Sequence, residues 1–150
     1  MSIAIAAGML VIAAGFALVR ARDHQPAPPP ELATYMAALQ HHTHKLNLSI
    51  QAENAALAGF YLREVEEASE QIEQLFPEHD GFPVAALVHA QLDPRLAALN
   101  EAIEGTRWDD AQSGLSDLIA GCNGCHAVAA HGFIKVEVTT ANPFNQSFTN

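Results

Sequence analysis

The sequence predicts an all-α fold, an antiparallel four-helix bundle with an N-terminal apolar segment and an extended C-terminal arm. Apolar residues recur at three- and four-residue steps through residues 32–129, as they do in helices that bury one face. Capping and turn-forming residues divide this stretch into four segments, and short connections between them make consecutive helices antiparallel. The predicted parts are an apolar segment, a Pro-rich linker, the bundle and the arm, in residues 1–22, 23–31, 32–129 and 130–150.

The apolar segment carries no charge between Ser2 and Val19, and about 18 apolar residues is close to the minimum that spans a bilayer. An uncleaved membrane anchor is favoured over a cleaved signal peptide, because no Lys or Arg precedes the run and no A-x-A site follows it. Arg20 and Arg22 oppose the anchor, since the positive-inside rule would place that end in the cytoplasm. The linker that follows contains a proline run, residues 25–30, which favours a semi-rigid polyproline spacer.

The first two helices are predicted on either side of Asn54, which suits the N-cap of the second. The buried stripe of the first comprises Leu32, Met36, Leu39, Thr43, Leu46 and Ile50. That of the second comprises Ala58, Leu62, Val65, Ala68, Ile72 and Leu75. The acidic residues of the second helix lie mostly off the stripe, as a solvated face or a docking surface for a basic partner; they are Glu64, Glu66, Glu67, Glu70 and Glu73.

A loop over residues 76–83 precedes the third helix, which is predicted to be broken. Val84 to Leu92 form one piece, and Asp93 and Pro94 restart the helix as cap and first-turn residue, until Gly105 ends it. The fourth helix has the cleanest period, through Trp108, Ala111, Leu115, Leu118, Cys122 and Cys125. Residues 133–138 alternate like a strand but have no evident partner, so the tail is predicted to be an extended arm packed on the bundle.

Residues 122–126 read Cys-Asn-Gly-Cys-His, the C-x-x-C-H pattern of c-type haem attachment. Two thiols three positions apart can reach both vinyl groups of one porphyrin, and the next residue is placed to bind its iron. We therefore predict one covalent haem c on Cys122 and Cys125, with His126 as the proximal ligand. A thioredoxin-like motif would follow a strand, and a zinc site would need two further ligands, of which only His131 is near.

The bundle and the motif together resemble cytochrome c′, a four-helix family with C-x-x-C-H near the end of its last helix. The resemblance covers about residues 30–129 and implies a haem attached outside the cytoplasm and a homodimer, as many cytochromes c′ form. The chain is also similar to a set of bacterial haem proteins, in Gln40-His41-His42, Lys45-Leu46, Asn54, Leu57-Ala58, Phe133-Ile134 and residues 142–148. It departs from them in having Ala55 where they often have tryptophan, and its tail departs from cytochrome c′, which ends soon after the motif.

The antiparallel order places the first helix opposite the far face of the haem. His42 is the first candidate for the sixth iron ligand, because it lies three residues after Leu39 and four before Leu46 on the apolar stripe. His41, predicted to turn away from the stripe with His44, and Met36 are the alternatives, and an open or solvent-bound position is a further one. Lys45 or Arg63 could pair with a propionate; no metal role is predicted for His24, His79, His89 and His131.

The charge of the chain limits the classes of partner that it can bind. Its 7 Lys and Arg residues stand against 17 Asp and Glu residues, which gives a net charge of −10. Nucleic acid is excluded as a partner by its phosphates, and a redox protein with a basic patch is favoured. No catalytic constellation is present besides the haem, so an enzyme is not predicted. We expect an electron-transport protein on the periplasmic side of the bacterial cytoplasmic membrane, anchored, or free in the periplasm if the apolar segment is cleaved. A binder of nitric oxide or carbon monoxide at an open haem site is the alternative, and an accessory subunit with a structural haem is a weaker third.

Overall fold

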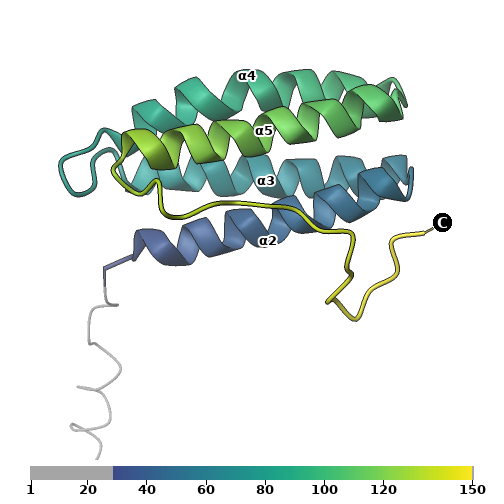
Figure 1. Cartoon of the computed structure of the whole chain (residues 1–150), viewed down its shortest axis with the longest axis horizontal. Coiled ribbons are helices and arrows are strands. Elements are labelled where there is room, and N and C mark those ends of the chain that lie inside the picture. Colours follow the sequence, from purple (N-terminus) through teal and green to yellow (C-terminus); the bar gives the residue numbers. More distant parts are fainter. Residues whose placement is uncertain (1–28, 150) are drawn as a thin grey trace, which may run out of the picture. The chain divides into compact units, whose positions relative to one another are not determined.

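The computed structural model describes residues 29–149, and the helices in this range are four. They are α2 (Leu32–Gln51), α3 (Ala55–Leu75), α4 (Val84–Glu104) and α5 (Trp108–Val128), and each runs antiparallel to the one before it (Figure 1). α2 packs on α3, α3 on α4 and α4 on α5, whereas the contact that closes the ring, between α5 and α2, is the loosest. The predicted four-helix bundle is confirmed.

The predicted apolar stripes form the core. All of their central positions are buried, and the fully enclosed side chains come from every helix: Leu46, Ile50, Leu62, Val65, Ile72, Leu99 and Leu118. Burying a side chain of this size contributes about 1.5–3 kcal/mol, so this ring of residues dominates the stability of the bundle. Leu32, Met36, Trp108 and Cys122 are only partly buried and pack against the edge of the core.

Two helix ends are capped by the residues that the sequence predicted, and one predicted core position is wrong. The Asn54 side chain accepts a hydrogen bond from the Leu57 amide at 3.1 Å, which confirms the predicted N-cap, and Gly105 caps the end of α4. The burial of Leu75 was predicted wrongly, since its side chain is 44% exposed. The next residue, Phe76, ends the helix as its C-cap and turns its ring into the core, against Tyr35.

The predicted break in the third helix is also wrong, because α4 is continuous through Pro94. A proline inside a helix cannot donate to the carbonyl four residues earlier, which here belongs to Ala90. Pro94 is on the exposed side of α4, where water can reach that carbonyl, and the Arg95 guanidinium donates to the carbonyl of Gln91. Leu92 and Leu96 stay buried on either side of the proline, so packing holds the helix together.

Residues 130–149 form the predicted extended arm, which contains no strand and crosses the bundle along α2 and α5 (Figure 1). Its anchors are mainly polar: Asn47 donates to the carbonyl of Thr139, His44 to that of Ala141 and Asn54 to that of Phe148. The Phe148 ring is buried, and it is the one arm residue within this range that joins the core. The arm therefore covers the loosest side of the helix ring.

The predicted apolar segment and most of the linker lie outside the described residues, and so does His24. Within residues 29–149, no helix has the length and apolar character needed to cross a membrane.

Candidate functional site

The whole C-x-x-C-H motif lies inside the last two turns of α5. Residues three and four apart share one face of a helix, so Cys122, Cys125 and His126 project to the same side. Cys125 is 8% exposed and Cys122 is partly buried against the core, as the period of the sequence predicted. Two thiols and an imidazole are thus presented together at one end of the bundle.

The two thiols lie in surroundings that disfavour their charged, thiolate forms. Burial raises the pKa of Cys122 to about 11, the neighbouring Cys125 adds to the rise, and the charge of Arg95 opposes it. Burial also raises the pKa of the Cys125 thiol. Redox nucleophiles need thiolates, which electropositive and partly exposed positions stabilise. Both thiols are instead protonated at neutral pH, which does not suit a thioredoxin-like reaction.

His126 is held by the arm. Its Nδ1 donates to the carbonyl of Ile134 at 3.2 Å, so the other ring nitrogen, Nε2, is the one left for a ligand. Metal-binding histidines almost always donate their second ring nitrogen in this way, because the bond sets the tautomer and the orientation of the ring. The backbone of the arm thus orients the side chain that the sequence predicts to be the proximal ligand.

Asn123, at one of the two x positions of C-x-x-C-H, joins the arm to α5 by two hydrogen bonds. Its Nδ2 donates to the carbonyl of Val136 at 3.0 Å, and its Oδ1 accepts from the amide of the same residue at 2.8 Å. This role was not predicted from the sequence. Asparagine is a poor residue for a helix interior, and this was the one available indication that its side chain had a partner elsewhere.

A cation that was not predicted to act here lies beside the motif. Arg95 of α4 is near enough for its charge to act on Cys122, and a Cβ at Gly121 would lie 3.0 Å from the Arg95 Cδ. Of the two cations predicted to pair with a propionate, Lys45 lies under the arm, with its Nζ 3.2 Å from Gln146 Oε1. Arg63 is exposed on α3. Arg95 is therefore a cation that acts on the thiols of the motif, and the pairing of Lys45 or Arg63 with a propionate stays a prediction.

The three candidates for the sixth ligand face different ways. The Nε2 of His42 is 3.8 Å from Glu64 Oε2 on α3, and its Nδ1 is buried without a hydrogen-bond partner. His41 is exposed and its ring lies edge-on to Phe144 of the arm. Met36 is the one that packs against the core. His42 is thus directed into the α2–α3 interface, and its assignment as a ligand stays a prediction.

The hollow beside α2 lies under the arm, with His41 and His44 on one wall and Val136 and Phe144 on the other. His44, predicted to face solvent or a neighbouring helix, instead donates to the arm and lies edge-on to Phe144. Neither the two cysteines nor His126 lines this hollow.

Comparison of the chain with protein-family models, with curated proteins and with solved structures finds no match.

Proposed function

We propose that this protein is a c-type cytochrome with one haem attached covalently to Cys122 and Cys125, and with His126 as the proximal iron ligand. The observation that carries the proposal is the shared face of α5 on which both thiols and the imidazole project, together with the bond from His126 Nδ1 to Ile134. A haem bound there supplies a one-electron iron couple. The four-helix bundle is the architecture that the resemblance of the sequence to cytochrome c′ implies.

The residues of the chain supply orientation and charge around that group. Ile134 holds the imidazole so that its Nε2 is available, and Asn123 fixes the arm segment that carries this carbonyl. Arg95 offers a positive charge beside the thiols. Burial by the core lowers the local dielectric, and in c-type cytochromes burial and hydrogen bonding set the potential.

The function that we infer is electron transfer on the periplasmic side of the bacterial cytoplasmic membrane, with the apolar segment as an anchor or a cleaved signal. The acidic character of the chain favours a redox partner with a basic patch, because complementary charge speeds the encounter of two proteins. A membrane tether would raise the local concentration of such a partner. A homodimer is part of the same proposal, and catalysis is not.

Binding of nitric oxide or carbon monoxide is the second candidate function, and the direction of His42 favours it. The Nε2 of this residue faces Glu64 on α3. If none of His42, Met36 and His41 reaches the iron, the far position is open to a diatomic ligand.

The first test is chemical. In the purified protein, covalent haem should survive denaturation and extraction with acid and organic solvent, and no free thiol should react after unfolding. Haem that is extracted, or two titratable thiols in the unfolded chain, would contradict the attachment at Cys122 and Cys125.

The second test separates the two functions by the optical and low-temperature EPR spectra of the holoprotein. Electron transfer predicts a low-spin iron that becomes high-spin in His42→Ala or in Met36→Leu. His44→Ala is the matched control on the same helix, because this side chain faces the arm. A high-spin parent protein that binds carbon monoxide readily after reduction would favour the gas binder.

A further inference from the structure

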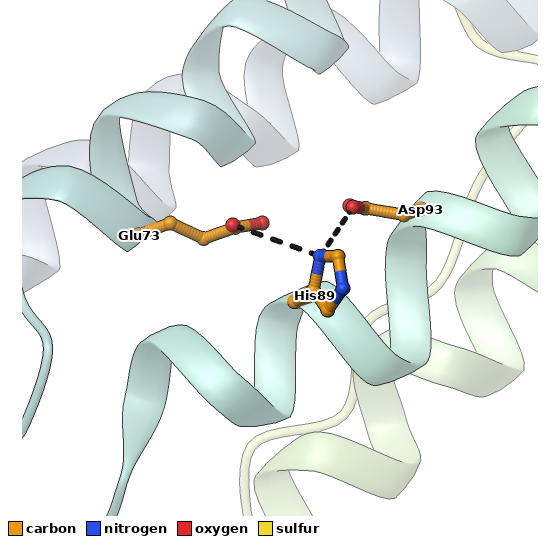
Figure 2. Close-up of side chains that lie close together, drawn as sticks. All are labelled: Glu73, His89 and Asp93. Atoms are coloured by element: carbon orange, nitrogen blue, oxygen red, sulfur yellow. Dashed lines mark ion pairs between the residues drawn. The ribbon is translucent and has the colours of Figure 1, made fainter.

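A second cluster of ligating side chains lies between α3 and α4, away from the cysteine motif. His89 and Asp93 are one turn apart on α4, and the His89 Nδ1 is 2.6 Å from Asp93 Oδ2. Glu73 of α3 reaches toward the same nitrogen, with its Oε2 at 4.0 Å (Figure 2). One ligating atom of each residue can be chosen so that all three lie within 4.8 Å of one another.

The surroundings of the cluster are strongly negative. Glu66 and Glu70 line the same groove as Glu73 and Asp93. Burial raises the pKa of Glu73, the charges of Asp93 and Glu70 raise it further, and His89 opposes them. Within residues 29–149, no Lys or Arg forms an ion pair with any of these carboxylates. The charge of Arg63 acts on Glu66, and the group that lies beside Glu73 and Asp93 is the His89 imidazole.

We propose that Glu73, His89 and Asp93 bind a divalent transition-metal ion, of the class of Zn²⁺, that bridges α3 and α4. Imidazole nitrogen with carboxylate oxygen is a donor set that suits Zn²⁺, whereas Mg²⁺ and Ca²⁺ prefer oxygen alone. Ligand atoms in a zinc site lie about 2.0–2.2 Å from the ion, so small side-chain rotations bring the three atoms to it. This site is independent of the proposed haem.

The exposure of the three residues gives the ion access. The side chains of His89, Asp93 and Glu73 are 71%, 43% and 25% exposed. On binding, the metal takes the position of the hydrogen between His89 and Asp93. A neutral imidazole then carries its hydrogen on Nε2, and a doubly protonated one releases one proton to solvent. The remaining coordination positions face water, so the ion links two helices without enclosing a reaction site.

The test is calorimetric titration of the full chain with ZnCl₂, in the parent and in His89→Ala and Glu73→Gln. Removing a partner outside the ligand shell of a metal typically costs 10–100-fold in affinity, so removing a ligand should weaken binding by at least about tenfold. The matched control is His79→Ala. This histidine also pairs with an aspartate, Asp80 at 3.6 Å, but it has no third ligand in the described part of the chain.

Thermal unfolding gives an independent readout of the bridge. Zn²⁺ should raise the melting temperature of the parent and of His79→Ala, and should not raise that of His89→Ala. Every variant keeps both cysteines and the α2 histidines, so zinc held at those residues would leave all the affinities equal. Equal affinities in parent and His89→Ala, or weakening by His79→Ala alone, would overturn the proposal.

Discussion

At the scale of single residues, the two cysteines are the most unusual side chains of the bundle. They lie where a helix would otherwise place aliphatic residues, and Cys125, at 8% exposed, is nearly as enclosed as Leu39, at 7%. Burial keeps a thiol neutral, because the charged form loses its hydration. Burial thus protects both thiols from ionisation at neutral pH in the chain without haem.

This protection has a measurable pH dependence in the chain without haem. The folded pKa of Cys122 is about 11 against a reference value of 9.0. A rise of about two units reduces the thiolate fraction at pH 8 by about 100-fold, so alkylation by iodoacetamide should be slower than in the unfolded chain by about that factor. The folded state binds the proton more tightly, so its stability should fall as pH rises from about 9 through the folded pKa.

The measurement is the alkylation rate of the folded chain at several pH values, with the chain in denaturant as the reference. Equal rates in the two states at pH 8 would show that the thiols are not buried.

Residue-level prediction succeeded where the information was local. The spacing of residues 122–126 and the period of α5 were enough to place both cysteines toward the core. The cap at Asn54 was found because its partner is three residues away. Asn123 and Arg95 were missed because the groups they meet belong to the arm and to a different helix, and no pattern in the sequence indicates those contacts.

At the scale of elements, two asparagine side chains bind the arm to the bundle, one in the first half of the arm and one near its C-terminal end. Asn123 binds its first half at Val136 through two hydrogen bonds. Asn54 binds its end at Phe148 at 3.1 Å while also capping α3, so one buried amide serves two elements. A substitution can remove the donor of the Asn54 side chain and keep its acceptor.

Asn54→Ala should lower the free energy of unfolding by about 1–3 kcal/mol, because it removes the cap and leaves the Phe148 carbonyl without its donor. Asn54→Asp should keep the cap but release the end of the arm, because its carboxylate cannot donate to Phe148. Denaturant unfolding measures the first effect, and limited proteolysis of the arm measures the second.

The control for both is Asn145→Ala, since Asn145 is exposed on the arm itself. An arm equally resistant to protease in the parent and in Asn54→Asp would contradict the role given to the Asn54 side chain.

The number of helices was predicted correctly, whereas the irregular positions within the third helix were not. The break expected at Asp93 and Pro94 did not occur, because burial of Leu92 and Leu96 outweighs the local cost of a proline. Asp93 was expected to cap a helix, and its carboxylate lies beside His89 instead. The strand-like alternation of residues 133–138 found no partner strand in the described chain, as expected, and was correctly predicted to form an arm.

At the scale of the whole molecule, the net charge of −10 should govern how redox partners approach. Salt screens such an interaction, since the Debye length falls from about 30 Å at 0.01 M to about 3 Å at 1 M. For the reduced holoprotein, oxidation by a cationic ruthenium ammine complex should slow several-fold over this range of ionic strength.

Ferricyanide is the matched probe, because its negative charge reverses the sign of the effect and its rate should rise with salt. Stopped-flow absorption at the haem bands measures both rates. Two rates that are equally insensitive to ionic strength would mean that the acidic surface does not steer electron exchange.

The loose contact between α5 and α2 also affects the order in which the molecule assembles. α2 with α3, and α4 with α5, are helical hairpins whose contacts are close in sequence, and such contacts form quickly. The arm depends on pairs more than 90 positions apart, such as Asn47 with Thr139 and Asn54 with Phe148, and closing long loops is slow. The second half of the arm is therefore the last part to dock. Its first half differs, because the His126–Ile134 and Asn123–Val136 bonds span only 8 and 13 positions and can form together with α5. The end of α5 that bears the cysteines is thus ordered before the far end of the arm closes over α2.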